Sequence, residues 1–329
     1  MTKVLITTVP FGDRDRKPLD LLEAAGIEYL VNPLGRKLKE EELAEMVADF
    51  DVLIAGTEPV TEKVMSSAGR LGLISRVGIG LDSVDLLAAE RRGIRVSYTP
   101  DAPAPAVAEL TLGLMLSLLR FAHVSNAQMH RGQWQRHFGR RIPEVTVGII
   151  GMGRIGRRVL NHLRGFGVGR VLVNDLNPDP ALSRDPGIEW VDKEEIYRRA
   201  DLITLHVPLT PQTRDLIGSQ QLRLMKPDAL LINTSRGGIV NEQDLADALN
   251  AGHLAGAAAD VFELEPYLGP LADIERCHLT SHLGSMSIDC RTRMEIEATE
   301  EALRFLSGKP LLNSVPPDEY QIQREGLRE

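Results

Sequence analysis

The chain has 329 residues, of which 43% are hydrophobic and 26% charged, and its formal net charge at pH 7 is −8. This length favours two domains over a single core, and the composition is that of a globular protein, which excludes the disordered and fibrous classes. The chain lacks a concentrated basic tract, so nucleic acid and membrane surfaces are not expected as partners. No apolar run reaches the ~18 residues that a membrane span needs.

Cysteine usage and the N-terminus narrow the class further. Cys277 and Cys290 form no CxxC pair and have no histidines at metal-ligand spacing. Neither a disulfide framework nor a metal site is therefore expected. The N-terminal residues enter a strand-like run directly, without a long apolar signal region. We expect a cytoplasmic protein.

The first hundred residues alternate short apolar runs with amphipathic stretches. Strands are expected at residues 3–8, 27–31, 51–56, 71–76 and 94–98, and helices at 19–26, 40–50, 61–69 and 83–92. Because parallel neighbours need crossover connections, this alternation predicts a parallel sheet with helices on its faces. We assign residues 1–101, together with 292–329, to a first, substrate-binding domain.

The next stretch has closely spaced prolines and then an apolar helix, which is expected at residues 106–121. Because this helix is apolar nearly all round, it must be covered on several sides. A second subunit and a buried position between domains explain this equally well. Four arginines follow, which we interpret as a solvated arm or a subunit contact, with a role near an anionic substrate left open: Arg131, Arg136, Arg140 and Arg141.

Residues 102–291 repeat the alternation and are assigned to a second, dinucleotide-binding domain. Strands are expected at residues 147–150, 171–175, 200–206, 229–233, 257–261 and 277–280, and helices from Gly156 and at 219–225 and 242–251. A helix at 288–306 then carries the chain back to the first domain, before a tail at 310–329. The fold class is α/β, with two Rossmann-like or flavodoxin-like doubly wound parallel-sheet domains.

A glycine-rich turn lies at the start of the second domain. Gly151, Gly153 and Gly156 have the GxGxxG spacing that lets backbone N–H groups approach a pyrophosphate at a helix N-terminus. Asp175 ends the next strand about twenty residues further on, where a carboxylate can accept hydrogen bonds from ribose hydroxyls. The turn and the acid together predict a dinucleotide site. The carboxylate would repel a 2′-phosphate and Leu176 is no cation, so NAD is expected rather than NADP.

Three polar residues of the second domain each follow an expected strand: Arg236, Glu265 and His282. Ligands of α/β sheets bind beyond the carboxyl ends of the strands, so these side chains are expected in one cleft. An arginine matches a carboxylate, a histidine moves a proton near neutral pH, and a carboxylate fixes the tautomer of a histidine. Taken singly, each is better explained as a surface residue, a turn cap or a loop histidine. Beside a dinucleotide site, the catalytic interpretation is favoured.

These residues lie in motifs through which the chain resembles the D-isomer-specific 2-hydroxyacid dehydrogenase family over nearly its whole length. The matching stretches are residues 76–85, 106–109, 151–156, 233–238, 260–266 and 281–284. The resemblance implies an NAD-dependent oxidoreductase in which Arg236 binds the substrate carboxylate and carbonyl oxygen. It implies His282 as the general acid/base and Glu265 as the residue that orients it.

The resemblance also implies a substrate site in a cleft between the domains, where the loop at Val77 and Gly78 gives backbone N–H groups to the carboxylate. Homodimers are implied through residues 106–143. The residues expected to line the cofactor are Gly151, Gly153, Arg154, Ile155, Gly156, Asp175, His206, Val207, Pro208, Thr213, Thr234, Ser235, Asp260 and Gly284.

Within the family the chain most resembles D-3-phosphoglycerate dehydrogenases of the short type. Those enzymes usually carry an arginine for the phosphate in the loop after the third strand, whereas Glu58 stands in this loop here and would oppose a phosphate. Asp101 replaces a glycine that is common in the family, which bears on the local loop shape. The expected reaction is hydride transfer between NAD and C2 of a small D-2-hydroxy acid or 2-keto acid. Candidates are 3-phosphoglycerate, hydroxypyruvate and glyoxylate.

Other functions stay open on the same scaffold. One is an NAD-sensing binding protein of the co-repressor kind, which can keep the three polar residues, and another is a phosphite dehydrogenase. Formate dehydrogenases share the architecture but are expected to have a glutamine in place of Glu265, which disfavours them.

Overall fold

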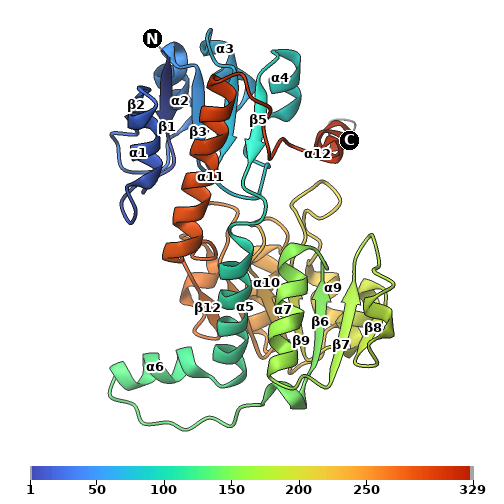
Figure 1. Cartoon of the computed structure of the whole chain (residues 1–329). Coiled ribbons are helices and arrows are strands. Elements are labelled where there is room, and N and C mark those ends of the chain that lie inside the picture. The colour runs from blue at the N-terminus through green and yellow to red at the C-terminus, as the bar shows by residue number, and fades with distance from the viewer. Residues whose placement is uncertain (1, 327–329) are drawn as a thin grey trace. The chain divides into compact units, whose positions relative to one another are not determined.

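A computed structural model of the chain describes residues 2–326 (Figure 1). The chain divides into two compact units. The first unit contains the part up to Pro103 and the part from Met286 onward, and the second is Ala104–Ser285. Both units are α/β and each has its own parallel sheet, as the sequence predicted.

The sheet of the first unit has five parallel strands in the order β2-β1-β3-β4-β5. The strands are β1 (Lys3–Ile6), β2 (Glu28–Val31), β3 (Val52–Ala55), β4 (Leu73–Arg76) and β5 (Arg95–Tyr98). The helices are α1 (Lys17–Ala24), α2 (Glu40–Met46), the 3₁₀ turn η1 (Val47–Asp49), α3 (Glu62–Ser67), α4 (Leu86–Arg91), α11 (Ile288–Leu306) and α12 (Pro317–Gly326). Alternate strand residues pack into two cores, one under α1 and α11 and one under α2, α3 and α4.

Residues 310–329 were interpreted from the sequence only as a tail, and part of this tail is helical. Residues Pro317–Gly326 form α12, which packs against α4. Gln323 ties the two helices, because its side chain accepts the Leu86 N–H at 2.9 Å and donates to the Val84 carbonyl at 2.8 Å. None of the α12 side chains is fully buried, so the helix lacks the apolar stripe that would have predicted it.

The sheet of the second unit has seven parallel strands in the order β12-β11-β10-β9-β6-β7-β8. The strands are β6 (Thr146–Ile150), β7 (Arg170–Asn174), β8 (Ile188–Trp190), β9 (Leu202–Leu205), β10 (Leu230–Asn233), β11 (Gly256–Ala259) and β12 (Cys277–Leu279). The strand order reverses between β6 and β9, which is where a doubly wound sheet binds its ligand.

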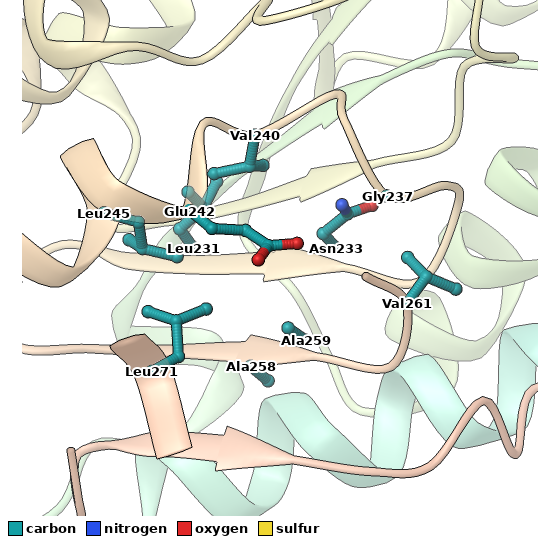
Figure 2. A pocket seen from close by; sticks show the side chains of 10 residues that line it. All are labelled: Leu231, Asn233, Gly237, Val240, Glu242, Leu245, Ala258, Ala259, Val261 and Leu271. Atoms are coloured by element: carbon teal, nitrogen blue, oxygen red, sulfur yellow. The ribbon is translucent and has the colours of Figure 1, made fainter. Parts of the chain in front are cut away.

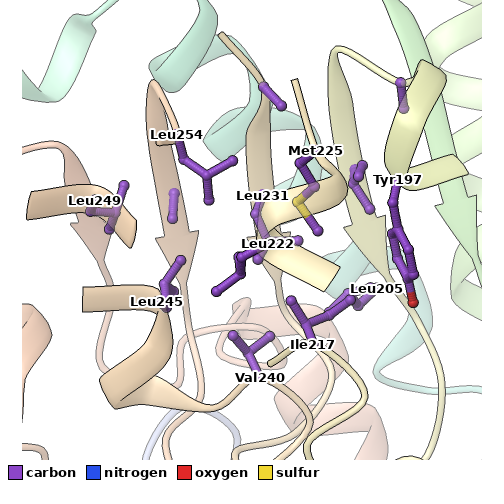
Figure 3. Packing of buried hydrophobic residues seen from close by; sticks show 14 of the residues in the cluster. Tyr197, Leu205, Ile217, Leu222, Met225, Leu231, Val240, Leu245, Leu249 and Leu254 are labelled. Carbon is purple, nitrogen blue, oxygen red and sulfur yellow. The ribbon is translucent and has the colours of Figure 1, made fainter. Parts of the chain in front are cut away.

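Helices cover both faces of this sheet, and their buried side chains form two cores. One core lies under α5 (Ala104–Leu119) and α7 (Arg154–Gly165). The other, part of which Figure 3 shows, lies under α8 (Lys193–Arg199), α9 (Ser219–Leu224) and α10 (Glu242–Asn250). Short 3₁₀ turns lie at Ile142–Glu144 (η2), Leu182–Arg184 (η3) and Pro270–Asp273 (η4). Cys277 and Cys290 are separate buried thiols, and burial raises the pKa of Cys277 to about 12.

Besides the short 3₁₀ turns, one strand and two α-helices of the second unit were not predicted: β8, α8 and α6 (Ala122–His130). Strand β8 has only three residues and lies at the sheet edge, so its apolar pattern is short. Helix α8 does carry a readable signal, because Asp192 caps it and basic residues end it. No single helix in residues 2–326 is long and apolar enough to cross a membrane. The joined α5 and α6 would pass on composition, but the chain bends by 67° between them.

Candidate active site

The glycine-rich turn joins β6 to α7 at the point where the strand order reverses. Gly151 has φ 98°, and a side-chain carbon there would lie 2.4 Å from the His206 carbonyl oxygen. A carbon at Gly156 would lie 2.0 Å from the Gly151 oxygen, so the helix can approach the turn only without a side chain. The protein's own packing therefore explains two of the three glycines.

Packing within the protein does not explain the third glycine, Gly153. Gly153 caps α7 with an ordinary φ of −75°, and no atom lies within 4 Å of the position that a side-chain carbon would take. The space over the helix N-terminus is open, and backbone N–H groups at such an end attract an anion. This arrangement fits a pyrophosphate that approaches the backbone at Gly153. Arg154 and Ile155 follow as the first residues of α7.

Asp175 follows β7 and is tied to the same turn. Its Oδ2 accepts the Met152 N–H at 2.6 Å, and its Oδ1 accepts the Asn177 N–H at 2.9 Å. The carboxylate is thus fixed beside the glycine turn while the side chain keeps some exposure. A ribose bound beside this turn would meet an oriented acceptor, as the dinucleotide prediction requires.

His206 lies at the end of β9, where the sequence predicts a cofactor contact followed by Val207 and Pro208. Burial lowers the pKa of His206 to about 3, so its ring is neutral at physiological pH. The ring Nε2 lies 3.0 Å from the Thr204 hydroxyl, and the backbone N–H donates to the Ile150 carbonyl at 2.7 Å. A neutral, anchored imidazole suits a wall of the site better than a proton donor.

Three predicted cofactor residues bond within the second unit through their hydroxyls. Thr213 donates to the Pro208 carbonyl at 2.6 Å, and Ser235 donates to the Asn233 side chain at 2.7 Å. The Thr234 hydroxyl lies 2.8 Å from that of Thr111 on α5. These bonds shape the loops after β9 and β10, and direct contact with a cofactor stays a prediction for all three.

His282 and Glu265 form a pair at the carboxyl edge of the second sheet. His282 Nδ1 lies 2.9 Å from Glu265 Oε2 and 3.1 Å from Oε1. The side chains are 33% and 25% exposed, so the pair is sheltered but reachable. Because Nδ1–H donates its hydrogen bond to the carboxylate, Nε2 is the ring nitrogen left to face a substrate. The Phe262 N–H donates to Glu265 at 3.1 Å and helps to hold its carboxylate.

Asp260 builds the loop that presents His282. Its buried carboxylate accepts the Thr280 hydroxyl at 2.6 Å, the Leu283 N–H at 2.7 Å and the Gly284 N–H at 2.8 Å. Its carbonyl also accepts the His282 N–H at 2.9 Å. These bonds hold His282 at φ 54°, a left-handed conformation that costs about 1 kcal/mol for a residue with a side chain.

The sequence predicts Asp260 only as a cofactor contact and not as a residue that holds this loop. Burial raises the pKa of this carboxyl group, and the bonded Thr280 hydroxyl and the two N–H groups act against that rise. The one available signal was an acid directly after the small-residue strand β11 (Gly256–Ala259).

Arg236 lies in the loop after β10, which packs on the Glu265 loop. The Asn233 side chain donates to the Arg236 carbonyl at 2.8 Å, and Arg236 Nη1 donates to the Ser235 carbonyl at 2.7 Å. A carbon added at Gly237 would lie 2.0 Å from the Phe262 carbonyl carbon, so the two loops are in backbone contact. The structure thus brings the loops of all three predicted catalytic residues together within the second unit.

In the first unit, the loop after β4 has its N–H groups engaged. Val77 donates to the Ala55 carbonyl at 2.9 Å, and Gly78 donates to the Thr99 hydroxyl at 2.8 Å. Gly78 has φ 145°, and a side-chain carbon there would lie 2.5 Å from the Arg76 guanidinium. The Gly78 N–H also donates to the Arg76 carbonyl at 3.1 Å, so both N–H groups are bonded within the first unit.

Two sequence expectations about first-unit loops need revision. Glu58 is only 1% exposed and accepts the Gly56 N–H at 2.9 Å and the Thr7 hydroxyl, so its carboxylate is turned inward and joins the loops after β1 and β3. Asp101 is not among the residues with positive φ, so its conformation does not require glycine.

The second unit combines a Rossmann-type sheet and its glycine turn with an acid after the second strand and a histidine–carboxylate pair at the carboxyl edge. This is the architecture of nicotinamide-dependent dehydrogenases. Comparison with known proteins agrees with this class. Residues 112–284 match the family model described as D-isomer specific 2-hydroxyacid dehydrogenase, NAD binding domain. The chain belongs to the D-isomer-specific 2-hydroxyacid dehydrogenase family, and this part is its NAD-binding domain.

Two curated relatives and one solved structure illustrate the similarity. D-3-phosphoglycerate dehydrogenase of Methanocaldococcus jannaschii is 37% identical over 96% of this chain, which spans only 59% of that relative's length. Glyoxylate reductase of Thermococcus litoralis is 34% identical, with 84% of this chain and 88% of the relative aligned. The crystal structure of the TT0316 protein from Thermus thermophilus superposes with a TM-score of 0.88 at 36% identity, covering 96% of this chain and 100% of that one.

Proposed function

We propose that this protein reduces a small 2-keto acid to its D-2-hydroxy acid with NADH, and catalyses the reverse reaction with NAD. The observation that carries the proposal is the bond between His282 Nδ1 and Glu265 at 2.9 Å, on a loop that Asp260 holds in place. The family assignment and the glycine turn support the choice of cofactor.

Each of the three residues has one role in the proposed reaction. NADH supplies the hydride that reduces the carbonyl carbon. His282 donates the Nε2 proton to the carbonyl oxygen, which becomes the hydroxyl, and Glu265 holds the ring and stabilises its protonated form before transfer. The Arg236 guanidinium binds the substrate carboxylate and polarises the carbonyl, since its planar fork matches a carboxylate. The sum is one keto acid, one NADH and one proton converted to one hydroxy acid and NAD.

Unphosphorylated substrates are favoured, glyoxylate and hydroxypyruvate first. Glu58 brings a buried acid, instead of a cation, to the loop after β3. One aligned relative, matched over most of its length, is a glyoxylate reductase.

NADH consumption should therefore be measured with glyoxylate, hydroxypyruvate, pyruvate, phosphohydroxypyruvate and 2-oxoglutarate. We expect turnover of the first two and none of the phosphorylated acid. Efficient reduction of phosphohydroxypyruvate would refute the argument from Glu58. If NADH is consumed with none of the five acids, an NAD-binding regulator would be favoured instead.

We also propose a homodimer formed through residues 106–143. Helix α6 is followed by an extended segment (Figure 1) in which Trp134 is 81% exposed and Phe138 is fully exposed. Two arginines of the predicted arm form ion pairs within the second unit: Arg131 with Glu275, and Arg140 with Asp228. The arm is thus fixed at both ends while its aromatic side chains face outward, which is typical of an interface.

Light scattering on the eluting protein tests the dimer. The expected mass is twice the 36.2 kDa of one chain. Replacing Trp134 and Phe138 together with alanine should give single chains, because it removes the two large apolar side chains of the arm without touching a core residue. An unaltered protein that elutes at 36.2 kDa would refute the dimer.

A further inference from the structure

A half-buried carboxylate is bonded to the loop that carries Glu265 and has no part in the reaction proposed above. Glu242 is the first residue of α10, and its side chain reaches into a small pocket at the carboxyl ends of β10 and β11 (Figure 2). The rest of the lining is mainly apolar and includes Leu231, Val240, Leu245 and Leu271. A carboxylate in such surroundings loses hydration, which is costly unless its oxygens receive hydrogen bonds.

The hydrogen bonds of Glu242 come from the loop that carries Glu265. Glu242 Oε1 accepts the Glu263 N–H at 2.8 Å, across 21 residues of chain. Burial raises the pKa of Glu242, the bonds from the Glu263 N–H and the Tyr267 hydroxyl lower it, and the charges of Glu263 and Glu265 raise it. The hydrogen bond to the Glu263 N–H thus ties Glu242 directly to the loop that carries Glu265.

The same loop is fixed on its other sides. Tyr267 stacks on Phe262 with ring centroids 4.0 Å apart, the Glu263 carboxylate pairs with Arg214 at 3.0 Å, and the backbone of Gly237 presses on Phe262. Glu265 takes its position from this loop, since the Phe262 N–H donates to its carboxylate. A shift of the loop backbone at Glu263 would move the carboxylate that orients His282.

We infer that Glu242 is a positioning residue for the Glu265–His282 pair, which it serves by anchoring the Glu263 N–H from within the apolar pocket. This inference rests on the proposed function. It follows because the bond acts on the backbone two residues before Glu265, and because a displacement of about 1 Å at a catalytic group can cost about a hundredfold in rate. The role needs an acceptor oxygen at this place and does not need a negative charge.

Three variants test the inference. Glu242→Ala removes the acceptor, and we expect kcat for the keto acid to fall about ten- to a hundredfold, with the dissociation constant of NADH almost unchanged. Glu242→Gln keeps a carbonyl oxygen for the Glu263 N–H and should restore most of the rate. The matched control is Asp244→Ala, because Asp244 lies on the same helix and accepts a backbone N–H from Ser219 at 2.8 Å, away from the Glu265 loop. Its kcat should stay near that of the unaltered protein.

A second readout separates this inference from the proposed function. In protein with ¹⁵N-labelled histidine, the Nδ1 resonance of His282, assigned by its loss in His282→Asn, reports the bond to Glu265 without any turnover. It should shift in Glu242→Ala and stay in place in Glu242→Gln and Asp244→Ala. If the unaltered protein reduces no keto acid, the proposed function fails and this resonance alone decides the inference. An unshifted resonance in Glu242→Ala, or equal loss of kcat in Glu242→Ala and either of the other variants, would overturn it.

Discussion

Replacing His282 with asparagine should lower kcat for keto acid reduction by about 10²–10⁴-fold, because the variant has no group that can donate the proton to the carbonyl oxygen. Asparagine is chosen because it tolerates the left-handed backbone at φ 54° better than most residues, so the loop should keep its shape. Steady-state kinetics at saturating NADH, together with the dissociation constant of NADH, measure the effect.

The control for this prediction is His253→Ala, which removes an exposed histidine from the turn after α10 and should leave kcat unchanged. A His282→Asn protein that binds NADH normally and still turns over near the original rate would show that His282 is not the acid/base. Loss of NADH binding along with the rate would point instead to a disturbed loop.

The second large effect is expected at the glycine turn, where Gly156→Ala should change stability and Gly153→Ala should change cofactor binding. Gly156→Ala places a carbon 2.0 Å from the Gly151 oxygen and should lower the free energy of unfolding by about 1–3 kcal/mol, as overpacking does. Gly153→Ala meets no protein atom within 4 Å and has an ordinary φ, so its stability should not change. The same carbon would obstruct a pyrophosphate, and we expect NADH to bind at least about tenfold more weakly.

Thermal unfolding without cofactor and NADH titration distinguish the two variants. The decisive pattern is a stable Gly153→Ala protein that has lost NADH affinity. If Gly153→Ala unfolds as early as Gly156→Ala, or binds NADH as tightly as the unaltered protein, then the open space over α7 is not the pyrophosphate site.

The regular part of the fold could be predicted from the sequence because strand and helix signals are local. The buried runs of β3, β4, β9 and β10 and the caps of α3 and α10 are visible in short windows of sequence. Elements without an apolar stripe were missed, such as α12, since the residues that hold α12 lie far away on α4.

The candidate site shows the same limit. The positions of Arg236, Glu265 and His282 after successive strands were enough to predict that their loops lie at the same edge of the second sheet. The bonds by which Asp260 and Glu242 hold the loops were not predicted, because both acids act on backbone groups about twenty residues away, and only the folded chain reveals those bonds. The inward orientation of Glu58 escaped prediction for the same reason, because its partner Thr7 lies about fifty residues away, in the loop after β1.

The most direct test of the proposed reaction follows the hydrogen that NADH gives up. With NADH carrying deuterium at either face of C4, and with glyoxylate or hydroxypyruvate as substrate, mass spectrometry of the hydroxy acid shows whether deuterium reaches C2. The proposed reaction predicts that one of the two labelled cofactors transfers deuterium to C2 in nearly every turnover and that the other transfers none. Hydroxy acid without deuterium from both cofactors, or no hydroxy acid from any 2-keto acid, would contradict it.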